Sequence, residues 1–184
     1  MVNGLGDPQQ IDAAVQSVAE AGSGKVTFSP ANMMRPDEIA AMGDAAVDTF
    51  GGIDILVNNA GIQHVAPIQE FPTAKWDAII AINITSAFHT TASAVTGMRE
   101  RGYGRIINIA SAHGLTASPY KSAYVAAKHG IVGFTKTIGL ETARDPITCN
   151  AICPGYVLTP LVEAQIPDTM KEYNMSREDV IKNV

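Results

Sequence analysis

The chain has 184 residues, of which 46% are hydrophobic and 17% are charged, and its formal net charge is −5. These values are typical of one folded domain, which we expect to span residues 1–184, and they argue against intrinsic disorder. The sequence shows no basic run for a nucleic-acid surface, no apolar run near the ~18 residues that cross a membrane, and no signal peptide. We therefore expect no nucleic-acid or membrane partner and a cytoplasmic location.

The first elements in chain order carry clear boundary signals. Asp7 followed by Pro8 predicts the N-cap and the first residue of a helix, which Gly22 would end. A strand over 25–29 follows, because this short run is rich in β-forming residues. A second helix begins at Pro36 and stops at a pair of glycines at 51 and 52.

Short runs rich in Val and Ile then alternate with segments of helical periodicity. The expected elements are a strand over 53–57, a long helix over 73–101, a strand over 104–111, a helix over 118–143 and a strand over 147–152. Ser176 opens a further helix. Strands that alternate with helices predict an α/β fold with a parallel sheet.

Polar and glycine residues gather in the loops that follow three of the strands. These loops read NNAGIQH after 53–57, AHGLTASPYKSAY after 104–111 and CPGYVLTP after 147–152. Ligands of such sheets bind beyond the carboxyl ends of the strands. We therefore expect the three loops to line one binding edge.

Tyr124 and Lys128 stand four apart in the predicted helix over 118–143, so they share one face. One interpretation is an ordinary pair on the helix surface, stabilising by a few tenths of a kcal/mol. The other is a hydride-transfer site in which Tyr124 is the general acid–base. Lys128 would then lower the pKa of the tyrosine, and Ser111 would hold the substrate oxygen.

These residues resemble the short-chain dehydrogenase/reductase family. The resemblance rests on NNAG (58–61), Asn83, Ser111, YVAAK (124–128) and PGYVLTP (154–160), in this order and spacing. It implies a Rossmann-like, doubly wound parallel sheet and an oxidoreductase that uses a nicotinamide cofactor. It also implies a homo-tetramer for the full-length protein.

The resemblance assigns roles to further residues. Asn83 would hold a water that connects Lys128 to solvent, as a catalytic member of the set, although a plain helix-interior amide is the alternative for Asn83. The implied cofactor-binding residues are Asn32, Met33, Asn59, Ala60, Gly61, Tyr124, Lys128, Pro154, Gly155, Val157 and Thr159.

The choice of cofactor also follows from the residues. A 2′-phosphate needs a nearby Arg or Lys, and residues 1–24 contain neither, which favours NAD over NADP. Asn32 stands where the family usually has an Asp, and its amide can both donate to and accept from adenine.

Within the family, the resemblance is strongest to members that act on (R)-3-hydroxybutyrate. It implies that Gln63, His113, Lys121 and Gln165 grip the carboxylate of a small 3-hydroxy acid, with acetoacetate as the product. Lys121 and Gln165 could instead be a solvated helix residue and a plain loop residue. The alternative functions are a dehydrogenase for another small hydroxy acid or ketone, and a non-catalytic subunit that only oligomerises.

No metal site is expected. Cys149 and Cys153 lack the partners that a disulfide framework or zinc site needs, so we interpret them as small buried residues. His64, His89 and His129 fit no metal-ligand spacing.

The family begins with a strand and a glycine-rich turn that binds pyrophosphate, and neither is present in residues 1–184. We expect the segment before Asp7 to be the end of the family's second strand, so that the fold is truncated at both ends. The missing strand belongs in the middle of the sheet, and its absence would leave two strands with unpaired edges.

Overall fold

The structure, a computed structural model, describes residues 1–183, without the side chains of residues 160, 161 and 183. Its strands are β1 (Val2–Asn3), β2 (Phe28–Ser29), β3 (Ile55–Asn58), β4 (Gly104–Ile109) and β5 (Ile147–Ile152). Its α-helices are α1 (Pro8–Glu20), α2 (Pro36–Phe50), α3 (Thr73–Ile80), α4 (Ser86–Arg101), α5 (Ser122–Glu141), α6 (Pro160–Glu163), α7 (Ile166–Tyr173) and α8 (Arg177–Asn183). A π-helical turn, Ala81–Thr85, joins α3 to α4, and two 3₁₀ turns cover Ile68–Glu70 and Ala112–Gly114.

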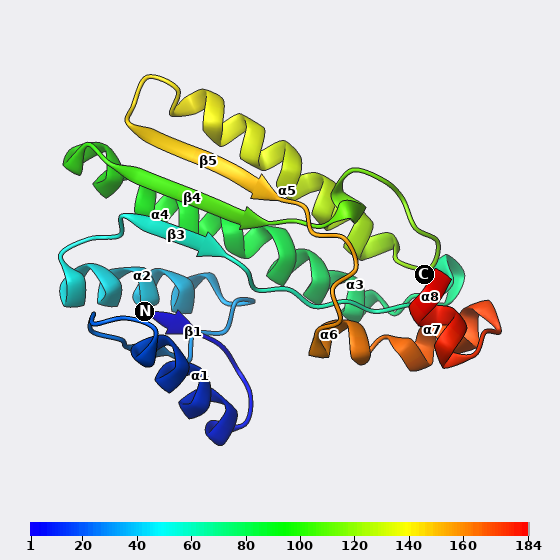
Figure 1. Ribbon diagram of the computed structural model, residues 1–184. Coiled ribbons are helices and arrows are strands. Elements are labelled where there is room, and N and C mark those ends of the chain that lie inside the picture. The colour runs from blue at the N-terminus through cyan, green and yellow to red at the C-terminus, as the bar shows by residue number, and fades with distance from the viewer. Residues whose placement is uncertain (184) are drawn as a thin grey trace.

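All strands pair in parallel, which confirms the predicted α/β fold of Rossmann type. β3, β4 and β5 form one sheet in that order, and β1 pairs with β2 in a second, smaller sheet. Figure 1 shows β1 and α1 at one end of the molecule and α6 to α8 at the other. The carboxyl ends of β3, β4 and β5 point toward α6 to α8.

Local capping chemistry sets several helix boundaries as expected. The Asp7 side chain accepts hydrogen bonds from the backbone N–H groups of Gln9 and Gln10 at the start of α1. Gly51 ends α2 in the left-handed region, with φ of 80°, where a side chain would be strained. Gly22 directly follows Ala21, the C-cap of α1, although it does not adopt the left-handed conformation of many stop glycines.

Two helices depart from the prediction, one in its first residue and one in its internal geometry. The helix expected over 118–143 begins only at Ser122, because Pro119 is followed by Tyr120 in the left-handed region, with φ of 63°. The helix expected over 73–101 is continuous but widens at Ala81–Thr85, where the Ser86 N–H donates to the Ala81 carbonyl five residues back. Both departures lie beside the candidate site.

The run from Thr73 to Arg101 is long and apolar enough to cross a membrane by length and composition. Within it, Ser86, Thr90 and Thr91 are buried polar residues. Residues of α4 pack against β3, β4 and α2. Buried polar groups that contact a sheet are typical of the core helix of a globular domain.

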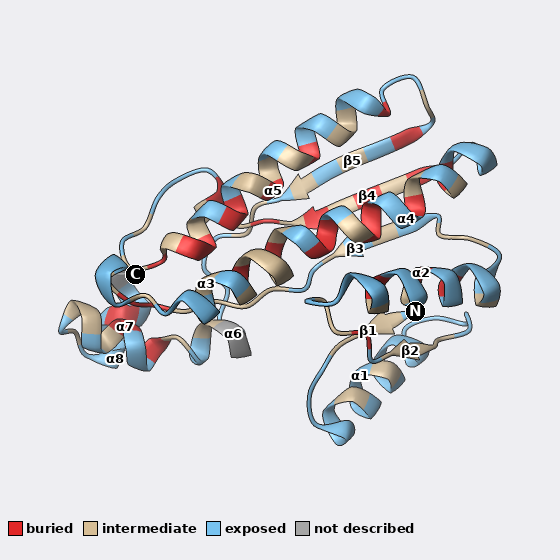
Figure 2. Cartoon of the chain, turned by 180° about the vertical axis from the view of Figure 1, so that it is seen from behind, coloured by how far each residue is buried: buried red, intermediate tan, exposed pale blue. Residues whose placement is uncertain are grey.

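The core lies between the three-stranded sheet and the helices on one of its faces. Figure 2 shows the buried residues of α4 and α5 on the sides of these helices that face β4 and β5. One buried cluster joins Met98 of α4 to Ile106 of β4, and another joins Ala110 to Ile131 of α5. On the opposite face of the sheet, Ile55, Val57 and Ile152 are exposed.

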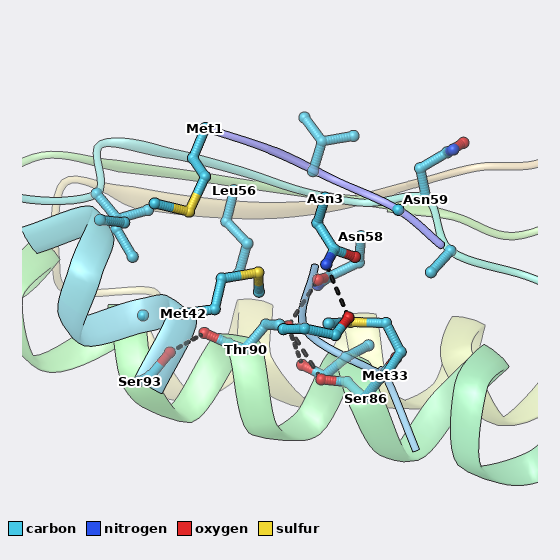
Figure 3. A pocket seen from close by; sticks show the side chains of 18 of the residues that line it. Met1, Asn3, Met33, Met42, Leu56, Asn58, Asn59, Ser86, Thr90 and Ser93 are labelled. Carbon is cyan, nitrogen blue, oxygen red and sulfur yellow. Dashed lines mark hydrogen bonds between the residues drawn. The ribbon is translucent and has the colours of Figure 1, made fainter. Parts of the chain in front are cut away.

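The two sheets are separated by a cavity of about 710 Å³ that both β1 and β3 line. Asn3 of β1 and Met1, which precedes β1, face Leu56 and Asn58 of β3 across it (Figure 3). Among the described residues, each of these strands pairs on one edge only, β1 with β2 and β3 with β4. This is the arrangement expected where the family has a further central strand.

The unpaired edge of β3 has a measurable consequence. In a parallel ladder alternate residues bond to the same neighbour, and the Arg105 N–H donates to the Asp54 carbonyl. This register turns the N–H groups of Leu56 and Asn58 toward β4 and those of Ile55 and Val57 toward the cavity. We expect the latter amides to exchange with deuterium at least ~100-fold faster, measured by NMR. Equal protection of all four amides would contradict the unpaired edge.

Candidate functional site

The loops after β4 and β5 are joined by backbone hydrogen bonds beyond the ends of both strands. The Ala110 N–H donates to the Ile152 carbonyl, and the Ala112 N–H donates to the Pro154 carbonyl, both at 2.8 Å. The N-terminal half of α5 packs on the 3₁₀ turn that follows Ser111. The sequence therefore brings the polar loop residues and the start of α5 to one place.

Ser111, Tyr124 and Lys128 meet there, as predicted. Ser111 hydrogen-bonds to Tyr124, and its Oγ also accepts the backbone N–H of His113 at 3.1 Å. The Lys128 Nζ lies 5.5 Å from the centroid of the Tyr124 ring. Tyr124 is 9% exposed and Lys128 is 4% exposed, which rules out the alternative of a pair on the helix surface.

The ammonium of Lys128 is held inside the protein. Its Nζ donates to the carbonyl of Ile109, the last residue of β4, at 2.7 Å. Burial lowers the pKa of Lys128 from 10.5 to about 8, with a small opposing contribution from Cys153. The Lys128 ammonium is thus charged at pH 7, and its pKa of about 8 lies not far above that pH.

The expectation that Lys128 lowers the pKa of Tyr124 is wrong for this structure. Burial raises the pKa of the Tyr124 phenol, and the hydrogen bond with Ser111 is the only contribution that lowers it. A nearby Tyr156 raises the pKa further. Tyr124 is therefore held in its neutral form, able to donate a proton, because desolvation of the phenolate outweighs its polar contacts.

Asn83 is buried in the π-helical turn, and its side chain bonds to the loop after β3. Its Oδ1 accepts the N–H of Ile62 at 2.9 Å, and its Nδ2 donates to the carbonyl of the same residue at 3.0 Å. Ile62 directly follows the NNAG segment. The amide therefore clamps the loop after β3 to the turn between α3 and α4, and one N–H of Nδ2 and one lone pair of Oδ1 remain for a further partner.

Two of the four expected carboxylate-binding residues stand beside Tyr124. The ring of His113 meets the Tyr124 ring edge to face, with centroids 6.1 Å apart. Burial and the charge of Lys121 lower the pKa of His113, so its ring is neutral at neutral pH. Lys121 is 2% exposed and is the N-cap of α5, so the alternative of a solvated helix residue is wrong.

The two glutamines approach the site from other loops. The amide nitrogen of Gln63, after β3, is buried and has no hydrogen-bond partner within the described residues. Such an orphaned donor is costly unless a ligand or water accepts from it. Gln165 is the N-cap of α7 and lines a cavity of about 200 Å³ together with Lys121.

Tyr156 is a site residue that sequence reasoning missed. Its hydroxyl accepts a hydrogen bond from the Lys121 Nζ at 3.0 Å. Its ring meets the ring of His113 edge to face, with centroids 5.9 Å apart. The sequence could have indicated this role, because Tyr156 lies in the PGYVLTP segment between residues that were expected to bind the cofactor.

The expected adenine-side residues line the large cavity. Asn32, Met33, Asn59, Ala60 and Gly61 all border it, and Figure 3 shows Met33 and Asn59 around the same space. The Oδ1 of Asn32 accepts the Met34 N–H at 2.9 Å, and its second lone pair and the Nδ2 donors remain for a base edge.

The expected nicotinamide-side residues follow β5 and lie apart from that cavity. The carbonyl of Pro154 is bonded to the loop after β4, and Gly155 lies in the same exposed segment. Thr159 caps α6 through its Oγ1, which accepts the Val162 N–H at 3.4 Å. Val157 borders the smaller cavity with Lys121 instead.

Comparison with known proteins identifies related chains. Residues 5–169 match the profile of the short chain dehydrogenase family. The chain is 56% identical over all 184 residues to D-beta-hydroxybutyrate dehydrogenase of Rhizobium meliloti (strain 1021), of which it covers 71%. It is 61% identical over 167 residues, 90% of its length, to D-beta-hydroxybutyrate dehydrogenase of Cupriavidus necator (strain H16), of which it covers 64%. It is 41% identical over 177 residues, 96% of its length, to an uncharacterized oxidoreductase of Bacillus subtilis (strain 168), of which it covers 68%.

The buried Lys128 predicts a specific dependence of stability on pH. Between pH 8 and 10.5 the unfolded chain holds the lysine proton that the folded chain has lost, so the free energy of unfolding rises with pH. Below about pH 8 both states are charged and the burial cost is present in full. We expect Lys128→Met to raise the free energy of unfolding at pH 7 by on the order of 2 kcal/mol and to flatten the rise.

The measurement is urea unfolding across this pH range, followed by circular dichroism. Lys136→Met, an exposed lysine on the same helix, is the matched control and should change stability by less than ~0.5 kcal/mol. A destabilised Lys128→Met at pH 7 would mean that the hydrogen bond to Ile109 outweighs the cost of burial.

Proposed function

The chain belongs to the short-chain dehydrogenase family, and from this premise we propose that it carries the catalytic residues of an NAD-dependent 3-hydroxybutyrate dehydrogenase. The reaction moves a hydride between the C3 carbon of 3-hydroxybutyrate and NAD, with acetoacetate as the oxidised product. Two relatives bear the name D-beta-hydroxybutyrate dehydrogenase, and the chain spans 71% and 64% of their lengths.

The roles of the residues follow from their contacts. In the reduction direction, the neutral Tyr124 phenol donates its proton to the C3 oxygen. In the oxidation direction, Tyr124 must first release its proton to solvent, and the phenolate then accepts the proton of the C3 hydroxyl. Ser111 hydrogen-bonds to Tyr124, so one oxygen of the substrate can contact both hydroxyls.

NAD supplies the hydride acceptor when bound, and the residues present fit its two ends. Asn32, Met33 and Asn59 border one part of the cavity between β1 and β3 and suit the adenosine end. The Lys128 ammonium suits a ribose hydroxyl, and the segment from Pro154 to Thr159 suits the carboxamide. No Lys or Arg stands in residues 1–24, which supports NAD over NADP.

The proposed substrate class rests on one observation, which is that the ammonium of Lys121 is buried. This side chain is 2% exposed, and within residues 1–183 no carboxylate forms a salt bridge with it. A buried cation without a counter-charge is unfavourable unless a ligand brings the negative charge. The neutral His113 and the orphaned amide of Gln63 supply further hydrogen bonds for the same anion.

The setting of the enzyme is also part of the proposal. Exposed Phe88 on α4 and Leu140 on α5 would be covered in a homo-tetramer formed through these helices. A cytoplasmic location suits the metabolism of a small ketone body.

Tyr124→Phe tests the catalytic assignment, because it removes one hydroxyl and keeps the ring. We expect NAD-linked oxidation of (R)-3-hydroxybutyrate, followed by NADH absorbance, to fall by about 10²–10⁴-fold. The melting temperature should change little. An active variant would remove Tyr124 from its acid–base role, and an inactive wild-type protein would refute the proposed function.

Lys121→Ala tests the substrate class. A charge-assisted hydrogen bond in a partly closed site is worth roughly 1.5–3 kcal/mol, so kcat/KM for 3-hydroxybutyrate should fall about 10- to 100-fold. Oxidation of 2-butanol, a neutral alcohol, should change little, and so should both reactions in Lys136→Ala. Equal losses on both alcohols would show that Lys121 supports the fold or Tyr124 rather than the carboxylate.

A further inference from the structure

Tyr156 contacts two of the proposed carboxylate-binding residues at once. Its hydroxyl accepts from the Lys121 Nζ at 3.0 Å, and the same ammonium lies 5.3 Å from the centroid of its ring. Its ring also packs edge to face on His113. Since His113 packs in turn on Tyr124, Tyr156 links the buried cation to the catalytic tyrosine.

The hydrogen bonds of this pair are only partly used. An ammonium has three donors and a phenol has one donor and two acceptor lone pairs. Among the described residues, the Lys121 Nζ has its one hydrogen bond with Tyr156, and the phenol proton of Tyr156 is donated to no acceptor. A spare O–H donor therefore stands directly beside spare N–H donors.

Exposure gives the two side chains different access to a ligand. Tyr156 is 56% exposed, whereas Lys121 is 2% exposed. Both line the cavity of about 200 Å³ that α6, α7 and α8 border. An anion that enters from solvent meets the tyrosine before it reaches the lysine.

We propose that Tyr156 is a specificity-determining residue that donates its phenol proton to the substrate carboxylate while its oxygen holds the Lys121 ammonium. This rests on the proposed function, which it deepens by adding a residue that selects for a carboxylate. The tyrosine orients the ammonium and supplies a second donor to the same anion. Tyr156 thus discriminates an acid from a neutral molecule of the same shape.

The test compares acetoacetate with pentane-2,4-dione, in which a methyl ketone replaces the carboxylate. Binding of each to the purified chain is measured by NMR titration in wild type and in Tyr156→Phe. Phe keeps the ring contact with His113 and removes only the hydroxyl. We expect acetoacetate to bind about tenfold more weakly, equivalent to about 1.4 kcal/mol, and the binding of pentane-2,4-dione to change less than about twofold.

Two further variants test whether the loss of acetoacetate affinity comes from the contact between Tyr156 and Lys121. Tyr103→Phe, at an exposed tyrosine outside the site, should leave both affinities unchanged. In a Lys121→Met background, Tyr156→Phe should cost acetoacetate less than about threefold, because the two side chains act on one anion. In NADH-linked reduction of acetoacetate, Tyr156→Phe should raise KM about tenfold with kcat nearly constant.

The outcomes separate this proposal from the one on which it rests. Wild-type protein that binds acetoacetate without turnover, with weaker binding in Tyr156→Phe, supports the role of Tyr156 and refutes the dehydrogenase. Equal losses on both probes, or no loss on either, overturn the role of Tyr156 even in an active enzyme. The same role is overturned if the wild-type chain binds no acetoacetate.

Discussion

Buried hydrogen bonds across the sheet hold the elements that carry the site in one register. Thr90 Oγ1 on α4 donates to Asn58 Oδ1 on β3 at 2.6 Å, and Asn58 Nδ2 donates to Asn108 Oδ1 on β4 at 2.8 Å. The Nδ2 of Asn108, which is fully buried, then donates to Thr135 Oγ1 on α5 at 2.8 Å. A shift of any one element would strand several buried polar groups, each at a cost of about 1–3 kcal/mol. The strand before the catalytic serine and the helix with the tyrosine and lysine are therefore fixed together.

Features that depend on neighbouring residues could be predicted from the sequence, and features that depend on distant contacts could not. The cap at Asp7 and the stop at Gly51 are local chemistry, and both lie where the sequence puts them. The left-handed Tyr120 delays α5, and its ring packs on a tyrosine of α7 far along the chain. Helical spacing sufficed to bring Tyr124 and Lys128 together, whereas Ser111 reaches them through the turn after β4. The bond from Lys121 to Tyr156 joins separate loops, so no spacing rule reveals it, and the pKa of the catalytic tyrosine depends on burial that only the fold defines.

The site gathers groups that a fold selected only for stability would avoid. Lys121 and Lys128 are buried ammonium groups, the amide nitrogen of Gln63 lacks a partner among the described residues, and Tyr120 is strained. Each of these features opposes folding by itself. Their presence in the loops after β3 and β4 and on the first turns of α5 is the expected mark of a ligand site, because the ligand supplies the missing charge and acceptors. The surrounding hydrogen bonds and packed helices hold these groups in place before the ligand arrives.

The division of the sheet into two parts bears on how the chain unfolds. The β1–β2 pair and α1 contribute no residue to the buried clusters that join β4 to α4 and α5, and α1 has no buried residue. With a cavity between β1 and β3, few contacts transmit stability from one part to the other. The N-terminal part would then melt before the rest, and the calorimetric enthalpy of unfolding would exceed the van't Hoff enthalpy. A continuous strand across that space would merge the two parts into one cooperative unit.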